Sequence, residues 1–267
     1  MERISSRQNS LAKRFRALAH AGGGGDDILL DGPHLLEEAL DGGLGVSISA
    51  FADSALDSRL AALADRAARA GVRTLAATDA LFDALSPAQQ PSGVVSISRR
   101  PVADLDAALD RAPQLLVLLE GVQDPGNVGA IIRAAEAFGA TAVIVGAGSA
   151  DPFGWKALRG AMGSSLRLPV VSRASLADTL RTLRAANVRI LAAVPRAGQA
   201  PAELDLRGPS AIVLGGEGAG VTDSLANGAD QRVTVRMQPP VESLNVAVAA
   251  ALVLYEASRQ RGDVAVR

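Results

Sequence analysis

The sequence of 267 residues lacks cysteine altogether and contains only two histidines, His20 and His34. Without cysteine the chain forms no disulfide and offers no thiolate as a metal ligand or a nucleophile. Two histidines argue against a histidine-based metal site and against a Ser-His triad. We therefore expect a protein without a metal site that works in the cytoplasm.

Long hydrophobic runs are also missing. No window approaches the roughly 18 uninterrupted apolar residues of a membrane-spanning helix, and residues 1–20 are charged, without the apolar core of a secretory signal. Hydrophobic residues make up 48% of the chain and charged residues 21%, which is the balance of a globular protein rather than a disordered one. The length allows one large domain or two smaller ones.

Lysine is scarce, because Lys13 and Lys156 are the only two beside many arginines. The formal net charge is −1, yet positive charge is concentrated in two stretches. Residues 1–20 contain Glu2 as their one acid, and residues 154–177 contain no acid. Either stretch could follow a phosphate backbone, although a solvated helix face produces the same pattern. The candidate nucleic-acid contacts are Arg7, Lys13, Arg14, Lys156 and Arg159.

The first part of the chain alternates between short strands and helices. Residues 1–20 have a helical pattern. The segments that follow are predicted as strands at 28–30, 46–51, 73–76 and 94–98, and as helices at 33–40, 55–70 and 78–85. Residues 99–113 contain two prolines and no long apolar run, which predicts a linker with room for one helical turn.

A second α/β series begins at residue 114. Leu115–Leu119 is a continuous apolar run, as in a strand buried on both faces, and a helix that stops at Gly139 follows it. Further strands are predicted at 142–145, 168–171, 189–193, 211–214 and 232–235, and a final helix at Leu244–Arg259. The alternation predicts an α/β fold with a mostly parallel sheet and helices on both faces. Ligands of such sheets bind beyond the carboxyl ends of the strands.

Three segments share one pattern, in which a short apolar run meets a turn rich in glycine or proline and then a polar residue in an apolar setting. They are Leu119–Ala140, Ile212–Val221 and Val235–Arg261. The segments place five candidate catalytic residues at element ends, where functional side chains concentrate. These are Asn127, Arg133, Glu217, Ser243 and Asn245.

Two glycine-rich stretches could also indicate a nucleotide-binding loop. The stretch GGEGAGVT at 215–222 nearly fits a P-loop, but Val221 replaces the phosphate-binding lysine. After the glycines at 146–148, Asp151 occupies the third glycine position of the dinucleotide fingerprint, where a carboxylate would repel a pyrophosphate. A nucleotide-dependent enzyme is therefore disfavoured, while the glycines still indicate a close backbone approach or a positive φ.

Local patterns suggest roles for the polar residues of the three segments. Asn127 lies at a helix start and could cap it, and Ser243 is a plausible cap of the last helix. Arg133 lies within or beside a packed apolar stripe, where a guanidinium needs a carboxylate such as Glu217 or a substrate phosphate. Asn245, one turn into the last helix, is a costly polar residue on an apolar helix.

Together the three segments resemble the SpoU-type family, the trefoil-knotted RNA 2′-O-ribose methyltransferases of the SPOUT superfamily. The resemblance covers roughly Leu115–Arg261 and rests on DPGNVGAIIRAAEAFGA, LGGEGAG and SLNVAVAAA, in the family's order and spacing. The stretches ISSRQNSLAKRFRALA and LLDGPHLLEEAL look like that family's small RNA-binding domain, an L30e-like α/β fold. One departure is Gly160, where relatives often carry a small hydroxyl residue after the arginine.

The resemblance implies an RNA substrate-binding domain at 1–98, a linker at 99–113 and a trefoil-knotted methyltransferase domain at 114–267. It implies S-adenosyl-L-methionine as the cofactor, held by the second and third motif loops. It also implies a homodimer whose active site lies close to the dimer interface. The implied cofactor contacts are Val194, Gly215, Val235, Met237 and Leu244.

The implied reaction is in-line transfer of a methyl group to a ribose 2′-oxygen, without a metal. The resemblance puts Arg133 nearest the 2′-hydroxyl. Because a guanidinium stays protonated, we favour Arg133 as a residue that binds an RNA phosphate and orients the hydroxyl. Asn127 would position the nucleotide or Arg133, and Glu217 would anchor Arg133. Ser243 and Asn245 would hold the third loop and contact the substrate.

Ribosomal RNA is the favoured substrate, because relatives with an added N-terminal domain of this kind mostly modify ribosomal RNA. A transfer-RNA 2′-O-methyltransferase and a non-catalytic RNA-binding relative are the alternatives.

Overall fold

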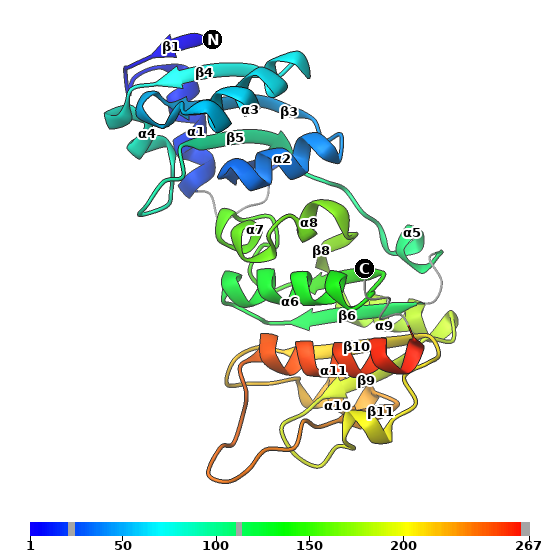
Figure 1. Ribbon diagram of the computed structural model, residues 1–267. Coiled ribbons are helices and arrows are strands. Elements are labelled where there is room, and N and C mark those ends of the chain that lie inside the picture. Colours follow the sequence, from blue (N-terminus) through cyan, green and yellow to red (C-terminus); the bar gives the residue numbers. More distant parts are fainter. Residues whose placement is uncertain (21–24, 111–113, 263–267) are drawn as a thin grey trace. The chain divides into compact units, whose positions relative to one another are not determined.

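The computed structural model describes residues 1–20, 25–110 and 114–262 (Figure 1). The chain divides into two compact units, Met1–Pro101 with Phe153–Arg167, and Val102–Pro152 with Leu168–Arg267. The segment Phe153–Arg167 therefore packs with the first unit, although the sequence-based division assigns it to the domain at 114–267. Within the described ranges, no helix has the length and apolar character needed to cross a membrane.

The first unit is built on a five-stranded sheet with the order β1-β4-β3-β5-β2. Its strands are β1 (Glu2–Ile4), β2 (Asp27–Asp31), β3 (Val46–Ala52), β4 (Arg73–Ala77) and β5 (Val94–Arg99). β4 pairs in parallel with β1 and β3, whereas β5 pairs antiparallel with β2 and β3. The helices are α1 (Ser10–His20), α2 (Pro33–Asp41), α3 (Ser58–Arg69), α4 (Asp79–Leu85), α7 (Trp155–Ala161) and α8 (Ser164–Arg167), with a 3-10 turn at Asp53–Ala55.

Successive residues of β3 divide the core of this unit into two layers. Ala50 belongs to a cluster with Phe15 of α1 and Phe82 of α4. The next residue, Phe51, belongs to a second cluster, to which α2 and α3 contribute Leu36 and Leu63. Because successive side chains of a strand point to opposite faces, α1 and α4 cover one face of the sheet and α2 and α3 the other.

The second unit contains a six-stranded, wholly parallel sheet with the order β11-β9-β10-β6-β7-β8. Its strands are β6 (Leu115–Glu120), β7 (Ala142–Gly146), β8 (Val170–Ala174), β9 (Arg189–Ala193), β10 (Ser210–Gly215) and β11 (Gln231–Val233). Its helices are α5 (Leu105–Leu109), α6 (Pro125–Ala137), α9 (Leu176–Ala185), α10 (Asp223–Gly228) and α11 (Val246–Arg261), with a 3-10 turn at Pro201–Glu203. The predicted α/β fold with a mostly parallel sheet is confirmed.

Helices cover both faces of the second sheet. Leu116 and Leu118 of β6 pack in a cluster with residues of α5 and α9. On the other side, α6 and α11 pack against each other and contact β7 and β10. β6 and β10 lie in the middle of the sheet, and their continuous apolar runs are buried on both faces.

Several element boundaries differ from those predicted. Residues 1–20 contain the edge strand β1 before α1, and α9 follows β8 where no helix was assigned. The helix predicted from residue 55 begins only at residue 58, because the carboxylate of Asp57 caps it by accepting the N–H groups of Arg59 and Leu60. The predicted linker contains the short helix α5, in agreement with the helical turn expected there.

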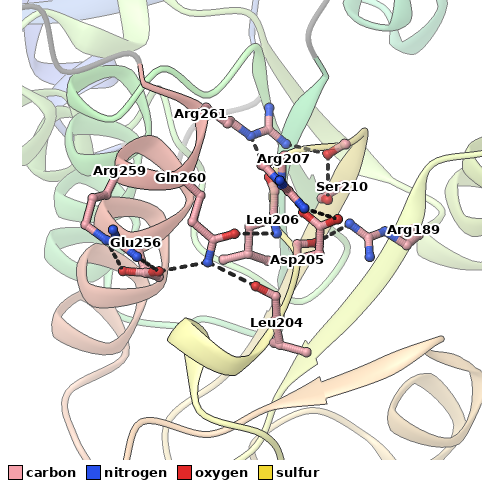
Figure 2. A network of polar contacts seen from close by, with 11 residues as sticks. Arg189, Leu204, Asp205, Leu206, Arg207, Ser210, Glu256, Arg259, Gln260 and Arg261 are labelled. Atoms are coloured by element: carbon pink, nitrogen blue, oxygen red, sulfur yellow. Dashed lines mark hydrogen bonds and ion pairs between the residues drawn. The ribbon is translucent and has the colours of Figure 1, made fainter.

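Hydrogen bonds from polar side chains connect the carboxyl end of α11 to the rest of the second unit (Figure 2). Gln260 Oε1 accepts the N–H of Leu206 at 2.8 Å. The guanidinium of Arg261 donates to three main-chain carbonyl groups, those of Leu206 at 2.8 Å, Gly208 at 2.7 Å and Gln114 at 3.2 Å. The last helical turn therefore holds both the segment before β10 and the start of β6.

Replacing Arg261 by methionine keeps most of the aliphatic stem but leaves those carbonyl groups without this donor. We expect Arg261→Met to lower the free energy of unfolding by about 1–3 kcal/mol, the cost of unpaired polar groups. The control is Arg259→Met, because Arg259 is 57% exposed and pairs with Glu256 one turn away, so its loss should cost no more than about 0.5 kcal/mol. Equal effects of the two variants in urea unfolding would contradict this role of Arg261.

Candidate functional site

The pairing of β6 with β10 determines where the first two loops begin. The strands are parallel, and their last residues, Glu120 and Gly215, are register partners. Both loops therefore leave the sheet at its carboxyl edge. The first loop leads into α6, where the carboxylate of Asp124 accepts the N–H of Asn127 at 2.9 Å. The alternative that Asn127 caps this helix does not hold, because Asp124 is the cap and Asn127 lies in the first helical turn.

The second loop, residues 215–221, folds back on itself through its backbone. Gly216 and Gly220 form an antiparallel bridge, and Gly220 has a φ of 66°. A Cβ atom on Gly215 would lie 1.9 Å from the carbonyl carbon of Gly220, and one on Gly216 would lie 2.0 Å from the carbonyl oxygen of Gly121. The expected close backbone approach is confirmed, and the approached group is other backbone of the same unit. Only glycine allows this loop to lie so close to the end of β6.

The side-chain amide of Asn127 connects the three predicted segments. Its Nδ2 donates to Oε1 of Glu217 at 2.6 Å, and its Oδ1 accepts from Nδ2 of Asn245 at 2.9 Å. Because an ionised carboxylate only accepts hydrogen bonds, the NH₂ group of Asn127 has to face Glu217, which turns its oxygen toward Asn245. One residue from each segment thus belongs to a single hydrogen-bonded chain, which we call the Asn–Glu–Asn chain.

Glu217 keeps its negative charge in this arrangement. Burial raises the pKa of its carboxyl group, but hydrogen bonds from Asn127, from its own backbone N–H and from the N–H of Gln123 outweigh that effect, so the pKa lies below its usual range. The nearby charge of Asp124 opposes the shift. At neutral pH Glu217 is therefore an acceptor that orients Asn127, not a proton donor.

Asn245 caps the last helix. Its Oδ1 accepts the N–H groups of Ala247 at 2.9 Å and Val248 at 3.2 Å, so that α11 begins at the next residue after Asn245. The prediction that Ser243 is the cap and that Asn245 lies one turn inside the helix is wrong. Because Nδ2 of the same amide donates to Asn127, Asn245 both begins α11 and ties it to the first loop.

Arg133 lies on the outer side of α6. The two isoleucines before it are fully buried, whereas Arg133 is exposed, and among the described residues its side chain makes no hydrogen bond or ion pair. Arg133 therefore lies beside the packed stripe and not within it, and of the two partners considered for it, Glu217 is not the one that it binds. Glu217 binds Asn127 instead, and the guanidinium of Arg133 is available to a phosphate.

A cavity of about 410 Å³ opens beside the Asn–Glu–Asn chain. Its walls come from the ends of β9, β10 and β11, from the second and third loops and from the start of α11. The lining includes all five predicted cofactor contacts, which are Val194, Gly215, Val235, Met237 and Leu244, and three predicted catalytic residues, which are Glu217, Ser243 and Asn245. A mostly apolar wall with a few polar groups is typical of a small-molecule site.

The sequence analysis missed a pair of residues that closes the second loop. Both carboxylate oxygens of Glu120 accept from Thr222, Oε2 from its N–H and Oε1 from its hydroxyl, each at 2.8 Å. Thr222 is also the N-cap of α10. The loop is therefore fixed at both ends, at Gly215 by the sheet and at Thr222 by Glu120. Glu120 was visible as a charge ending a buried apolar run, but no local pattern pairs it with a residue so distant in sequence.

The five predicted nucleic-acid contacts all lie in the first unit. Arg7 and Lys13 are exposed, and Arg14 pairs with Asp27. Lys156 and Arg159 lie on α7, where both approach the ring of Trp155. The cavity and the Asn–Glu–Asn chain belong to the second unit. The candidate nucleic-acid contacts and the candidate catalytic site therefore lie in different units.

A wholly parallel sheet with a glycine loop and an apolar cavity at its carboxyl edge is the arrangement in which α/β domains typically bind small organic ligands. The sequence profile of the SpoU rRNA Methylase family matches residues 114–255. The chain therefore belongs to the SpoU rRNA methylase family.

Several methyltransferases are similar in sequence to this chain over most of its length. An uncharacterized tRNA/rRNA methyltransferase of Synechocystis sp. is 34% identical over 263 residues, which cover 97% of this chain and 94% of that protein. The 23S rRNA (guanosine(2553)-2′-O)-methyltransferase RlmP of Bacillus subtilis is 33% identical, over 85% of this chain and 86% of its own. The solved SpoU methyltransferase AviRb from Streptomyces viridochromogenes, in complex with the cofactor AdoMet, is 29% identical with a TM-score of 0.82 and covers 95% of this chain and 98% of its own.

Thr222→Val removes the hydroxyl that Glu120 binds while keeping the backbone N–H and the side-chain shape. We expect this variant to lower the free energy of unfolding by about 1–2 kcal/mol and to speed amide hydrogen exchange in residues 216–220. Thr222→Ser keeps the hydroxyl and should exchange like the unchanged protein. If the valine and serine variants exchange alike, the hydroxyl of Thr222 does not hold the loop.

Proposed function

We propose that this protein transfers the methyl group of S-adenosyl-L-methionine to the 2′-oxygen of a ribose in RNA, and that the RNA is ribosomal. The observation that carries the proposal is the Asn–Glu–Asn chain at the edge of a cavity lined by the five predicted cofactor contacts. Membership of the family supports the reaction class. The relative RlmP is named as a 2′-O-methyltransferase of a guanosine in 23S rRNA, which supports the choice of RNA.

The residues of the cavity suit this cofactor. Apolar side chains such as Val194, Val235 and Leu244 can enclose an adenosine, and the glycine loop offers bare backbone groups to its polar atoms. The ionised Glu217 in the same lining matches a positively charged ligand. When bound, S-adenosylmethionine supplies a methyl group on a sulfonium, which is already an activated leaving group.

The described residues would act on the RNA mainly by positioning it. Arg133 stays protonated, so it would bind a phosphate and orient the 2′-hydroxyl rather than remove its proton. Glu217 holds Asn127, and Asn127 would hold the nucleotide against the cavity. Ser243, exposed in the cavity lining, would contact the substrate together with Asn245.

The remaining parts of the proposal follow from the family. Residues 1–98 would form the L30e-like RNA substrate-binding domain, 99–113 the linker and 114–267 the trefoil-knotted methyltransferase domain. The candidate RNA contacts remain Arg7, Lys13, Arg14, Lys156 and Arg159. The protein would act in the cytoplasm and need no metal.

A homodimer is also part of the proposal, and α11 supports it. Val248, Leu252 and Tyr255 are 49%, 44% and 50% exposed. Their spacing of four and then three residues puts them on one side of the helix, so they form an apolar stripe that a partner protein would cover. Since the N–H of Val248 is bound by Asn245, a second copy of this chain on the stripe would lie beside the Asn–Glu–Asn chain.

Arg133→Ala tests the site and the reaction together. We expect the variant to lose transfer of tritium from labelled S-adenosylmethionine to total RNA lacking the modification by at least about 100-fold, because the substrate is no longer oriented. Its affinity for S-adenosylhomocysteine should stay within about twofold, because Arg133 lies outside the cavity lining.

The labelled nucleoside then separates the alternatives. Label in a 2′-O-methylnucleoside of ribosomal RNA supports the proposal. Label only in transfer RNA would show that the reaction is assigned correctly but that the substrate is transfer RNA. Cofactor binding and label both missing from the unchanged protein would point to the non-catalytic RNA-binding relative. Unchanged turnover in Arg133→Ala would show that the site is assigned wrongly.

Leu252→Glu tests the dimer, because it places a charge in the middle of the apolar stripe. We expect the variant to be a monomer in size-exclusion chromatography with light scattering, and to lose most of its methyl transfer. Gln238→Glu adds the same charge at an exposed position outside the stripe and should remain a dimer. A dimeric Leu252→Glu variant would rule out this face as the interface.

A further inference from the structure

The outer side of α7 carries two of the candidate RNA contacts, Lys156 and Arg159, beside an aromatic residue to which no role has yet been given. Trp155 and Arg159 are spaced by four residues and share this side. Met162, which follows the helix in a left-handed backbone conformation, is 42% exposed. The opposite side of α7, formed by Ala157, Leu158 and Ala161, is fully buried, and α7 packs on β2. The packing of the buried side against β2 therefore fixes the orientation of α7 and of the residues on its outer side.

Trp155 differs from the other aromatic residues of the first unit. Phe15, Phe51, Phe82 and Phe153 are all buried, whereas Trp155 is partly exposed. It is also the only tryptophan of the chain. A partly exposed indole on a fixed helix offers a flat surface on which another flat ring can stack.

Positive charge surrounds this indole without nearby acids in the sequence. The Nζ of Lys156 lies 5.5 Å from the centre of the Trp155 ring, and the Cζ of Arg159 lies 5.9 Å from it. Residues 152–177 contain no aspartate or glutamate. An aromatic ring beside cations is the combination that single-stranded nucleic acids need, because a base stacks on the ring while the phosphates meet the cations.

A buried carboxylate holds Arg159 in this position. The side chain of Asp31 is only 2% exposed, and its Oδ2 lies 3.7 Å from Nη1 of Arg159. Among the described residues this oxygen has no hydrogen-bond partner, while Oδ1 accepts from Ser86 at 3.4 Å. Burial raises the pKa of Asp31, and Arg159 and Ser86 lower it in part. Burial of the Asp31 carboxylate costs folding free energy. We assign it the function of orienting Arg159.

We propose that Trp155 is a stacking platform for an unpaired RNA base, that Lys156 and Arg159 contact the phosphates beside it, and that Asp31 is a positioning residue for Arg159. The proposal rests on the proposed function, because it takes the RNA bound here to be the substrate. The occupant is a single strand or loop, since bases within a duplex are stacked on each other and hide their faces.

The single tryptophan allows direct observation of this platform. Its fluorescence is followed while the full-length protein is titrated with a short single-stranded RNA of mixed sequence, and with the same RNA annealed to its complement. We expect the single strand to quench the emission strongly and the duplex to quench it much less. Binding of the single strand is followed independently through a label on the RNA. If the RNA binds while the tryptophan emission stays unchanged, the proposal is overturned.

Substitutions then measure each contribution. Trp155→Ala should weaken binding of the single strand by roughly 5- to 150-fold, and Trp155→Phe should retain part of the affinity because it keeps a ring. Lys156→Ala should weaken single strand and duplex alike and reduce the slope of log affinity against log salt by about 1. Unchanged affinity in both Trp155 variants, with normal binding of S-adenosylhomocysteine as evidence of folding, would overturn the stacking role.

The role of Asp31 is tested by a double-mutant cycle with Arg159. Asp31→Asn keeps the size of the side chain and removes the charge that orients Arg159. We expect Asp31→Asn to weaken RNA binding on its own, but to cause no further loss when Arg159→Ala is already present. A purely structural Asp31 would lower stability without this coupling, and additive losses would overturn the positioning role.

Methyl transfer measured on the same samples separates this proposal from the proposed function. If the unchanged protein methylates RNA while Trp155→Ala leaves both RNA affinity and KM for RNA unchanged, the platform is wrong and the function stands. If RNA quenches Trp155 and Trp155→Ala weakens binding, but the protein binds no S-adenosylmethionine and transfers no methyl group, the platform stands and the function is wrong.

Discussion

The parallel pairing of β6 with β10 is the constraint on which the site depends. Because Glu120 and Gly215 end the two strands side by side, the loops that follow them start from the same edge. The glycine loop can then touch the backbone at Gly121, since no Cβ atom separates them. Asn127 and Glu217, which are 90 positions apart in the sequence, come within 2.6 Å of each other for this reason. A shift of either strand by one residue would separate them.

Asn127 converts this closeness into a defined geometry. Its amide has a donor and an acceptor side, and the ionised Glu217 accepts only from the donor side. The acceptor side then receives the NH₂ group of Asn245, whose own Oδ1 accepts backbone N–H groups at the start of α11. The polar contacts at the rim thus determine where the apolar walls of the cavity stand. Arg133 is left outside this chain and exposed, so its guanidinium is free for the phosphate contact that we propose.

The regular elements were predictable from the sequence, because buried strands read as continuous apolar runs. Leu115–Leu119 and 189–193 were found almost to the residue, and the cavity contains the cofactor contacts that the family resemblance implied. The capping residues were not predictable, since Asp124 and Asn127, or Ser243 and Asn245, are equally suitable caps until the backbone is known. Pairs such as Glu120 with Thr222 could not be predicted, because a hydrogen bond between distant segments produces no pattern in the local sequence. Whether Arg133 lies within or beside the packed stripe could not be decided from its apolar neighbours along α6, because a helix turns about 100° per residue.

The chain passes between its two units three times, after Pro101, before Phe153 and after Arg167. A gene fusion that simply adds one domain to the end of another gives a single crossing. Here, an exchange of the first unit between related genes would have to carry residues 153–167 from inside the second part as well. Otherwise Asp31 would lose Arg159, and Leu158 would lose the core in which it is buried. The two units are therefore bound to change together, and the matched family segment, residues 114–255, itself includes Phe153–Arg167 of the first unit.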